Sequence, residues 1–111
     1  MLLLAGCSAE PPSTMRIEGG DAQAGKQAIA RYGCTSCHAI PGLSSYGANV
    51  GPPLANMGAR AYVAGVVANT PENLVRWLQD PPAIAPRTAM PRLGITEREA
   101  RDMAAYLVKA P

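Results

Sequence analysis

The five residues Cys-Thr-Ser-Cys-His, positions 34–38, constrain this chain more than any other feature. They bring two of its three cysteines and its only histidine into one short turn. Thiols and an imidazole in such a cluster serve a small set of purposes: a zinc site, a redox-active dithiol, a structural disulfide, or the covalent attachment of a c-type haem. The rest of the sequence distinguishes between these four.

Three of the four sites fit the sequence poorly. A structural zinc site takes four nitrogen or sulfur ligands, and no second pair completes the three at 34–38. A redox dithiol of the thioredoxin kind belongs to a βαβ unit, and we find no alternating strand pattern. A disulfide between Cys34 and Cys37 leaves the adjacent His38 without a role. Covalent haem uses all three side chains, because each thiol forms a thioether and the imidazole faces the iron.

The composition also favours a haem. The chain has four Tyr, one Trp and no Phe, so the bulky side chains that usually fill a small core are scarce. A haem would supply the missing apolar volume. Eleven Gly and eleven Pro indicate long loops and few strands. The net charge of +2, with basic residues scattered along the chain, argues against a nucleic-acid partner.

The first residues predict a lipid anchor. The run Leu-Ala-Gly-Cys that ends at Cys7 resembles the lipobox of bacterial lipoproteins, in which a signal peptide is cut before a cysteine that then carries lipid. The apolar run before it is far shorter than the roughly 20 residues of a membrane-spanning helix. We expect residues 1–6 to be the truncated end of a lipoprotein signal and 7–19 to be an acylated cysteine with a flexible tether. The alternative for Cys7 is an ordinary free thiol.

A folded domain is predicted from residue 20 to residue 111. Its first helix is capped by Asp21 and ends at Gly33. A glycine inside that helix, Gly25, indicates close packing against another helix. The stretch from Ile40 to Gly58 is rich in Gly, Pro and Ser and predicts a long loop, which is uncommon in a small domain unless it wraps around something.

Two further helices carry clear end signals. One begins with Thr70 as its cap and Pro71 in its first turn, and the proline pair 81–82 is expected to stop it. A second proline-containing loop follows. The last helix opens with a capping box at residues 96–99. Its buried stripe is predicted to comprise Ala100, Met103, Ala104 and Leu107.

The run from about residue 19 to 110 resembles class I cytochromes c, which carry one haem. The resemblance lies in the order and spacing of GDAQAGKQAI, CTSCH, GPPLANMGAR, ENLVRWLQDP, PRTAMP and GITEREARDMAAYL. It implies an all-α fold of three to five helices around one covalent haem c. It also implies that the N- and C-terminal helices cross, at Gly25 and the region of Tyr106.

The same resemblance implies a methionine as the second axial ligand of the iron, opposite His38. Met90 lies in a proline-flanked loop after a helix and matches the family's ligand position. Met57 lies much closer to His38 in the sequence, and Met103 falls on the buried stripe of the last helix, where core packing is expected. With His38 and Met90 both bound, the iron would have no open position.

Four more positions match the family's haem surroundings. Pro52 corresponds to the proline whose carbonyl accepts the N–H of the ligand imidazole. Arg60 corresponds to a basic residue near a propionate, with a solvated arginine as the alternative. Trp77 is expected to pack on the haem, with its indole N–H near a propionate or the ligand sulfur. Thr88 is a weaker candidate for a propionate contact.

The resemblance implies an electron carrier rather than an enzyme, with redox proteins as donor and acceptor and no small-molecule substrate. A membrane respiratory complex is the expected partner. The lipobox and the haem together imply a bacterial protein, lipid-anchored in the periplasm or on the outer face of the cytoplasmic membrane. Arg87 and Arg92 flank the methionine loop and either dock an acidic partner or are solvated surface charge.

Two alternatives stay open. The segment 69–91 is similar to the cytochrome domains appended to haem-copper oxidase subunits, which implies a fixed haem subunit of a larger oxidase or quinol-oxidising complex. If Met90 is a labile ligand, the iron is open and the protein is a haem enzyme or sensor, although a single histidine leaves no distal acid–base group of the usual kind.

Overall fold

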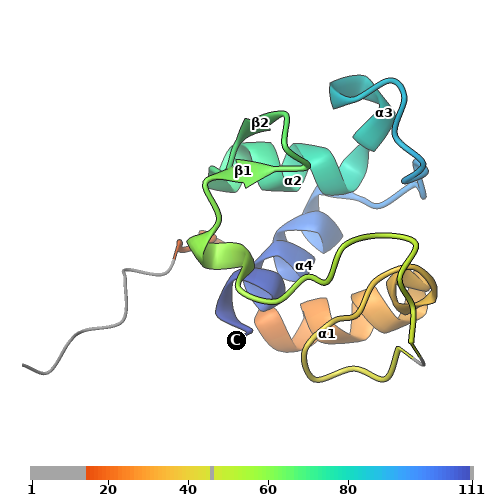
Figure 1. The fold of residues 1–111 in the computed structure, drawn as a ribbon. Coiled ribbons are helices and arrows are strands. Elements are labelled where there is room, and N and C mark those ends of the chain that lie inside the picture. Colours follow the sequence, from red (N-terminus) through yellow and green to blue (C-terminus); the bar gives the residue numbers. More distant parts are fainter. Residues whose placement is uncertain (1–14, 46, 111) are drawn as a thin grey trace, which may run out of the picture.

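Short helices joined by long loops form most of the fold in the computed structural model, which describes residues 15–45 and 47–110 (Figure 1). In chain order the elements are α1 (Ala22–Arg31), η1 (Cys34–Ser36), η2 (Met57–Ala59), β1 (Tyr62–Val63), β2 (Val67–Ala68), α2 (Pro71–Gln79), α3 (Pro81–Ile84) and α4 (Glu97–Lys109). The expected lipid-bearing Cys7 and most of the tether lie outside the described residues. No helix in the described ranges is long and apolar enough to cross a membrane.

The predicted N-terminal caps of α1 and α4 are confirmed, and α1 ends at Arg31, two residues before the predicted Gly33. The Asp21 carboxylate accepts the backbone N–H groups of Gln23 and Ala24 at 2.9 and 3.1 Å, which caps α1. At the start of α4, Thr96 Oγ1 accepts the Glu99 N–H at 3.1 Å and the Glu99 carboxylate accepts the Thr96 N–H at 3.2 Å. These caps satisfy backbone donors that have no partner inside the helix.

The proline pair does more than was predicted. α2 is capped by Thr70 and ends at Gln79, as expected, but Pro81 then starts α3 instead of ending all helical structure. A proline is well tolerated in the first turn of a helix, because the N–H it lacks would have no intrahelical partner there. The proline pair therefore stops α2 as predicted, and the short helix α3 that begins at Pro81 is an addition that the sequence analysis did not foresee.

A small antiparallel hairpin was not predicted. Strands β1 and β2 pair Tyr62 with Ala68 and Val63 with Val67. The chain reverses through Ala64 and Gly65, which both have left-handed backbone angles, at φ 53° and 70°. Strands of two residues are too short to show an alternating pattern, so the all-α prediction holds for the main architecture and misses this addition.

Helices α1 and α4 cross at the close contact that Gly25 allows (Figure 1). A Cβ on Gly25 would overlap the carbonyl oxygen of Asp102 and lie 2.9 Å from the Met103 nitrogen. The backbones therefore approach one another directly. On α4 the contact with Gly25 lies at Asp102 and Met103, one helical turn before the region of Tyr106 that was expected. The Tyr106 hydroxyl donates a hydrogen bond to the carbonyl of Pro41, in the loop after the cysteine motif.

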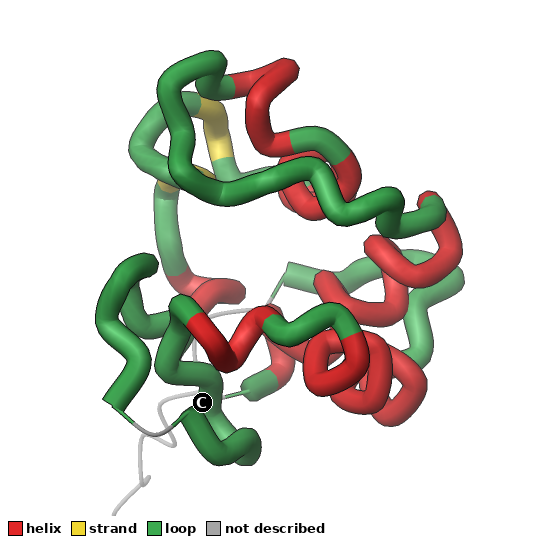
Figure 2. The backbone as a smooth tube through the Cα atoms, turned by 90° about the vertical axis from the view of Figure 1, so that its right-hand side faces the viewer, coloured by secondary structure: helices red, strands yellow, loops and turns green. Residues whose placement is uncertain are grey.

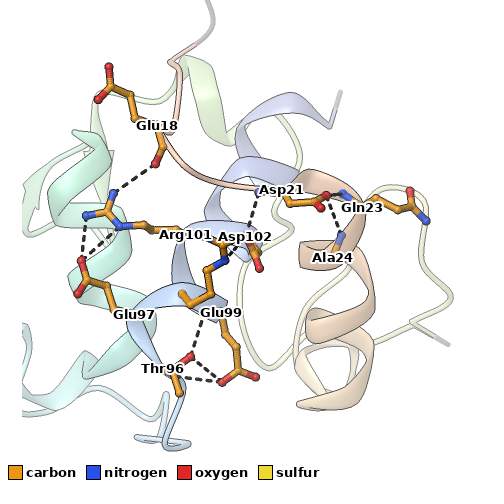
Figure 3. Close-up of polar contacts among 10 residues, drawn as sticks. Glu18, Asp21, Gln23, Ala24, Thr96, Glu97, Glu99, Arg101 and Asp102 are labelled. Carbon is orange, nitrogen blue, oxygen red and sulfur yellow. Dashed lines mark hydrogen bonds and ion pairs between the residues drawn. The ribbon is translucent and has the colours of Figure 1, made fainter.

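Polar groups fix the crossing at the N-terminal end of α1 (Figure 3). The buried carboxylate of Asp102 accepts the backbone N–H of Asp21 at 2.9 Å. Arg101 pairs with Glu97 at 2.9 Å and also reaches the carbonyl of Glu18. A negative group at the start of α1 also interacts favourably with the helix dipole.

The core lies between α4, α2 and α1. The predicted stripe of α4 is buried, and Met103 is fully inaccessible, which confirms its packing role. Met57 is also buried, in η2, which packs against α4 so closely that a Cβ on Gly58 would lie 2.6 Å from the carbonyl oxygen of Val108. The long loop from Ile40 to Gly58 thus ends on the C-terminal part of α4.

Candidate functional site

The cysteine motif forms a tight turn immediately after α1. Gly33 has a left-handed φ of 75°, which turns the chain out of the helix and into η1. The backbone N–H of His38 then donates to the carbonyl of Cys34 at 3.0 Å. Both thiols are free and half-buried, and burial raises the pKa of the Cys34 thiol. The structure therefore contains no disulfide at this motif, and both sulfurs remain available for thioethers.

The imidazole of His38 has a defined orientation and tautomer. Its Nδ1 lies 2.7 Å from the carbonyl oxygen of Pro52. A carbonyl oxygen carries no hydrogen, so Nδ1 is the donor in this contact, and in the neutral imidazole Nε2 then carries the free lone pair. The contact with Pro52 is the one that the family resemblance implied. It leaves Nε2 free to bind a metal, and such a hydrogen bond to the outer nitrogen raises the basicity of a ligand imidazole.

Gly51 forms a close-fitting support for this ring. A Cβ at Gly51 would overlap the His38 Cε1 and lie 2.8 Å from its Nε2. The backbone N–H of Gly51 also donates to the carbonyl of Cys37 at 2.8 Å. The loop therefore binds both the motif and the face of the ring, and the absence of a side chain at this position is a steric requirement.

Arg60 and Asn69 hold the loop that carries Pro52. The Nη2 of Arg60 donates to the carbonyls of Pro53 and Ala55 at 2.5 and 2.8 Å. The Nδ2 of Asn69 donates to the carbonyls of Met57 and Arg60 at 2.7 and 2.9 Å. The propionate contact expected of Arg60 stays a prediction. Asn69 was not singled out in the sequence, because an asparagine before a Thr-Pro helix start carries no signal for a contact with a distant loop.

Met90 lies in the loop that follows α3 and is half-buried against the core. Its backbone N–H donates to the hydroxyl oxygen of Thr88 at 3.1 Å, and the Thr88 N–H donates to the Ala85 carbonyl at 2.9 Å. Thr88 therefore shapes the methionine loop, while its expected contact with a propionate stays a prediction. Trp77 is buried on the inner face of α2. Arg87 and Arg92 are exposed on either side of Met90.

The methionine loop and the cysteine turn lie on the same side of the molecule. In Figure 1 both are at the right, with the loop after α3 above and η1 below, and Figure 2 views this side directly. Two segments that carry a histidine and a methionine, one below and one above the same region, suit the two faces of a flat cofactor. These residues fit a covalent haem: two free thiols, a histidine with Nε2 available, and a methionine carried by a separate loop.

Comparisons with known proteins agree with this class of site. The family model described as "Cytochrome c" matches residues 22–111. The chain is 32% identical over 99 residues to cytochrome c oxidase subunit 2 of Alkalihalophilus pseudofirmus, which covers 88% of this chain and 26% of that protein. It is 35% identical over 85 residues to the same subunit of Bacillus subtilis, covering 71% of this chain and 24% of that protein. The chain thus spans about a quarter of the length of these curated relatives.

Solved structures give the same answer for the fold. Cytochrome cH from Methylobacterium extorquens superposes with a TM-score of 0.58 at 27% identity, covering 81% of this chain and 99% of that one. Cytochrome c2 from Rhodobacter sphaeroides gives a TM-score of 0.58 at 22% identity, and the match covers 82% of this chain and 96% of that one. The chain belongs to the cytochrome c family, with a class I fold and one covalently bound haem c.

Proposed function

We propose that this c-type cytochrome transfers single electrons in a bacterial respiratory or related chain, that His38 and Met90 would bind the iron of its haem, and that Cys7 carries a lipid anchor. The observation that carries the ligand assignment is the 2.7 Å contact between His38 Nδ1 and the Pro52 carbonyl. It aligns the imidazole and leaves only Nε2 for a metal. The half-buried Met90, on the loop after α3, would supply a second ligand.

The proposed ligand set supports electron transfer rather than catalysis. A haem supplies a one-electron ferric–ferrous couple, and methionine ligation raises its reduction potential. The protein would exclude small molecules from the metal. It would also restrain the orientation of the His38 imidazole. Gly51 and Pro52 restrain His38, and Thr88 restrains the backbone at Met90. We expect a positive potential.

The test is an optical spectrum of the haem-loaded chain and of Met90→Ala. In the ferric state the unmodified protein should show the weak red band of sulfur-ligated iron, and the variant should lose it. Met57→Leu is the matched control, because Met57 is buried in η2 against α4 and its replacement should keep the band. A ferric protein without this band, or one that binds small ligands readily, would favour the enzyme or sensor alternative.

The membrane anchor has its own test. With a complete lipoprotein signal placed before Cys7, the chain should incorporate labelled fatty acid and sediment with membranes in a bacterial host. Cys7→Ser should remain haem-loaded but move to the periplasmic soluble fraction. Membrane association that persists in Cys7→Ser would show that another contact holds the protein there.

A second candidate function is a fixed haem subunit of a larger respiratory complex. Its support is the similarity to cytochrome c oxidase subunit 2 proteins, in which the matching region makes up about a quarter of the chain. After extraction in a mild detergent, a fixed subunit should migrate with a large complex in a native gel. A mobile carrier should migrate as a small lipoprotein.

A further inference from the structure

The segment that contains the haem-attachment turn has an unusual charge distribution. All ten Lys and Arg residues and all eight Asp and Glu residues lie outside the stretch between Arg31 and Arg60. That stretch includes η1, the loop after it, and the residues that support the His38 ring. Charged residues average about a quarter of a globular domain, so a largely loop-forming segment of this length would be expected to carry several.

The two arginines that border this stretch both contact other groups of the protein. Arg31 pairs with Glu99 of α4 at 2.9 Å. Arg60 directs its Nη2 to the carbonyls of Pro53 and Ala55. Arg60 keeps its positive charge, because its partners are neutral carbonyls, and Arg31 is balanced by the Glu99 carboxylate. Neither arginine is among the described residues that line the hollow beside the cysteine turn.

A hollow of about 420 Å³ lies within this segment, and none of its described lining residues is charged. Thr35 and Ser36 of η1 line one part of it, and loop residues 44–45 and 47–50 line the rest. Ser36, Ser44 and Asn49 are exposed there. The hollow therefore offers neutral hydrogen-bonding groups to a docked molecule.

Val50 provides an apolar contact at the rim of this hollow. Its exposed fraction of 74% is the highest among the large hydrophobic side chains in the described ranges. It directly precedes Gly51, whose backbone lies against the His38 ring. A partner that touches Val50 therefore comes close to the proposed ligand imidazole.

We propose that a redox partner docks on this uncharged face, formed by Val50 and the hollow beside it, and that the partner's contact surface is itself uncharged. This inference rests on the electron-transfer function proposed above. A charged partner group would lose its water here without meeting an opposite charge, which is unfavourable. An apolar side chain against Val50, with neutral hydrogen-bonding groups in the hollow, avoids that cost. Such an encounter is not steered by charge, so its rate depends little on salt.

The test uses the haem-loaded full chain. A second copy of the same protein serves as the partner, because it presents the same uncharged face. Two copies can present this face to each other and exchange an electron between their ferric and ferrous forms. NMR line broadening gives the self-exchange rate constant. Between about 0.02 and about 0.5 M ionic strength, the screening length falls from tens to a few ångströms. We expect the self-exchange rate constant to change by less than ~2-fold over this range.

Two lysine variants locate the contact. Val50→Lys places like charges opposite each other in the encounter, so self-exchange should slow by ~3-fold at low salt and recover at high salt. Val66→Lys is the matched control: Val66 is 53% exposed in the hairpin between β1 and β2, and its replacement should leave the rate constant unchanged.

Three outcomes would overturn the proposal. One is a rate constant that rises many-fold with salt in the unmodified protein. Another is a rate that responds to Arg92→Gln and not to Val50→Lys, because the methionine loop would then be the contact. The third is a stable dimer in light scattering that Val50→Lys dissociates, which would make a second copy the occupant of this face. Failure of the proposed function is distinct, since the iron would then show no reversible one-electron couple.

Discussion

The position of the His38 imidazole depends on a single missing side chain. In Gly51→Ala the new Cβ would overlap the His38 ring, and the ring or the loop must shift. We expect the contact between His38 Nδ1 and the Pro52 carbonyl to weaken and the free energy of unfolding to fall by about 2 kcal/mol, as for other overpacked sites. Urea unfolding and the NMR signals of the His38 ring measure the two effects.

The control for this variant is Gly47→Ala. Gly47 has a φ of 75° and no atom near its missing Cβ, so an alanine there costs about 1 kcal/mol of backbone strain without touching the ring. The His38 signals should stay unchanged in Gly47→Ala. Identical ring signals in the two variants would contradict a steric role for Gly51.

Glu99 gives the protein a defined response to acid. A hydrogen bond from the Tyr32 hydroxyl is the main cause that lowers the pKa of Glu99 from 4.5 to about 2, helped by the Thr96 backbone and hydroxyl. Because the pKa of Glu99 is lower in the folded state than in the unfolded state, its ionised carboxylate stabilises the fold. This stabilisation is complete above about pH 4.5 and is lost as the pH falls toward 2. Tyr32→Phe should therefore flatten the loss of stability between these two values, as measured by urea unfolding at a series of pH values.

Tyr62→Phe provides the comparison, because it removes the same hydroxyl from an exposed site on β1. The free energy of unfolding of Tyr62→Phe should fall with decreasing pH as it does in the unmodified protein. If Tyr32→Phe shows the same full loss of stability in acid, the hydrogen bond from Tyr32 is not what lowers the pKa of Glu99.

At the scale of elements, the crossing of α1 and α4 determines where the cysteine turn lies. The contact at Gly25 is between two backbones, so it has little room to relax. Gly25→Ala should separate the helices and lower the free energy of unfolding by about 3 kcal/mol, at the upper end for overpacking. Gln27→Ala, on the exposed face of α1, should change it by less than about 0.5 kcal/mol. Equal stability of the two variants in urea would contradict a backbone contact at this crossing.

The helices were predictable to the extent that their ends carry local signals. Asp21, Thr70 and Thr96 each satisfy nearby backbone N–H groups, and these signals placed the starts of α1, α2 and α4 correctly. The hairpin and α3 depend instead on a two-residue pairing and on a proline whose effect changes with its position in a helix. Neither leaves a periodic pattern in the sequence.

The site was predictable where a motif fixes the chemistry. The pattern at 34–38 and the family resemblance led to His38 and its contact with Pro52, and that contact is in the structure. The bonds from Arg60 and Asn69 to loop carbonyls were not foreseen, because backbone acceptors look alike in any sequence. The roles of Met90, Trp77 and Thr88 toward the haem stay predictions.

At the scale of the whole molecule, the haem compensates for a chain poor in aromatic residues. The core of the described residues consists mainly of aliphatic side chains and methionines, with Trp77 its one buried aromatic. Two long loops, around Pro52 and around Met90, contain little regular structure of their own. Because long loops lose much conformational entropy on ordering, they need a shared surface to pack against.

The unfolding behaviour of the haem-free chain follows from this composition. A Cys34→Ala/Cys37→Ala chain, which cannot form thioethers, should lose most of its free energy of unfolding, about 5 kcal/mol or more, since that is the whole stability of many small domains. Its urea transition by far-ultraviolet circular dichroism should be broad, while the haem-loaded chain unfolds cooperatively. Cys7→Ser keeps both attachment thiols and should unfold like the unmodified haem protein. A haem-free chain with the same midpoint and the same sharpness would show that the helices form a sufficient core without the cofactor.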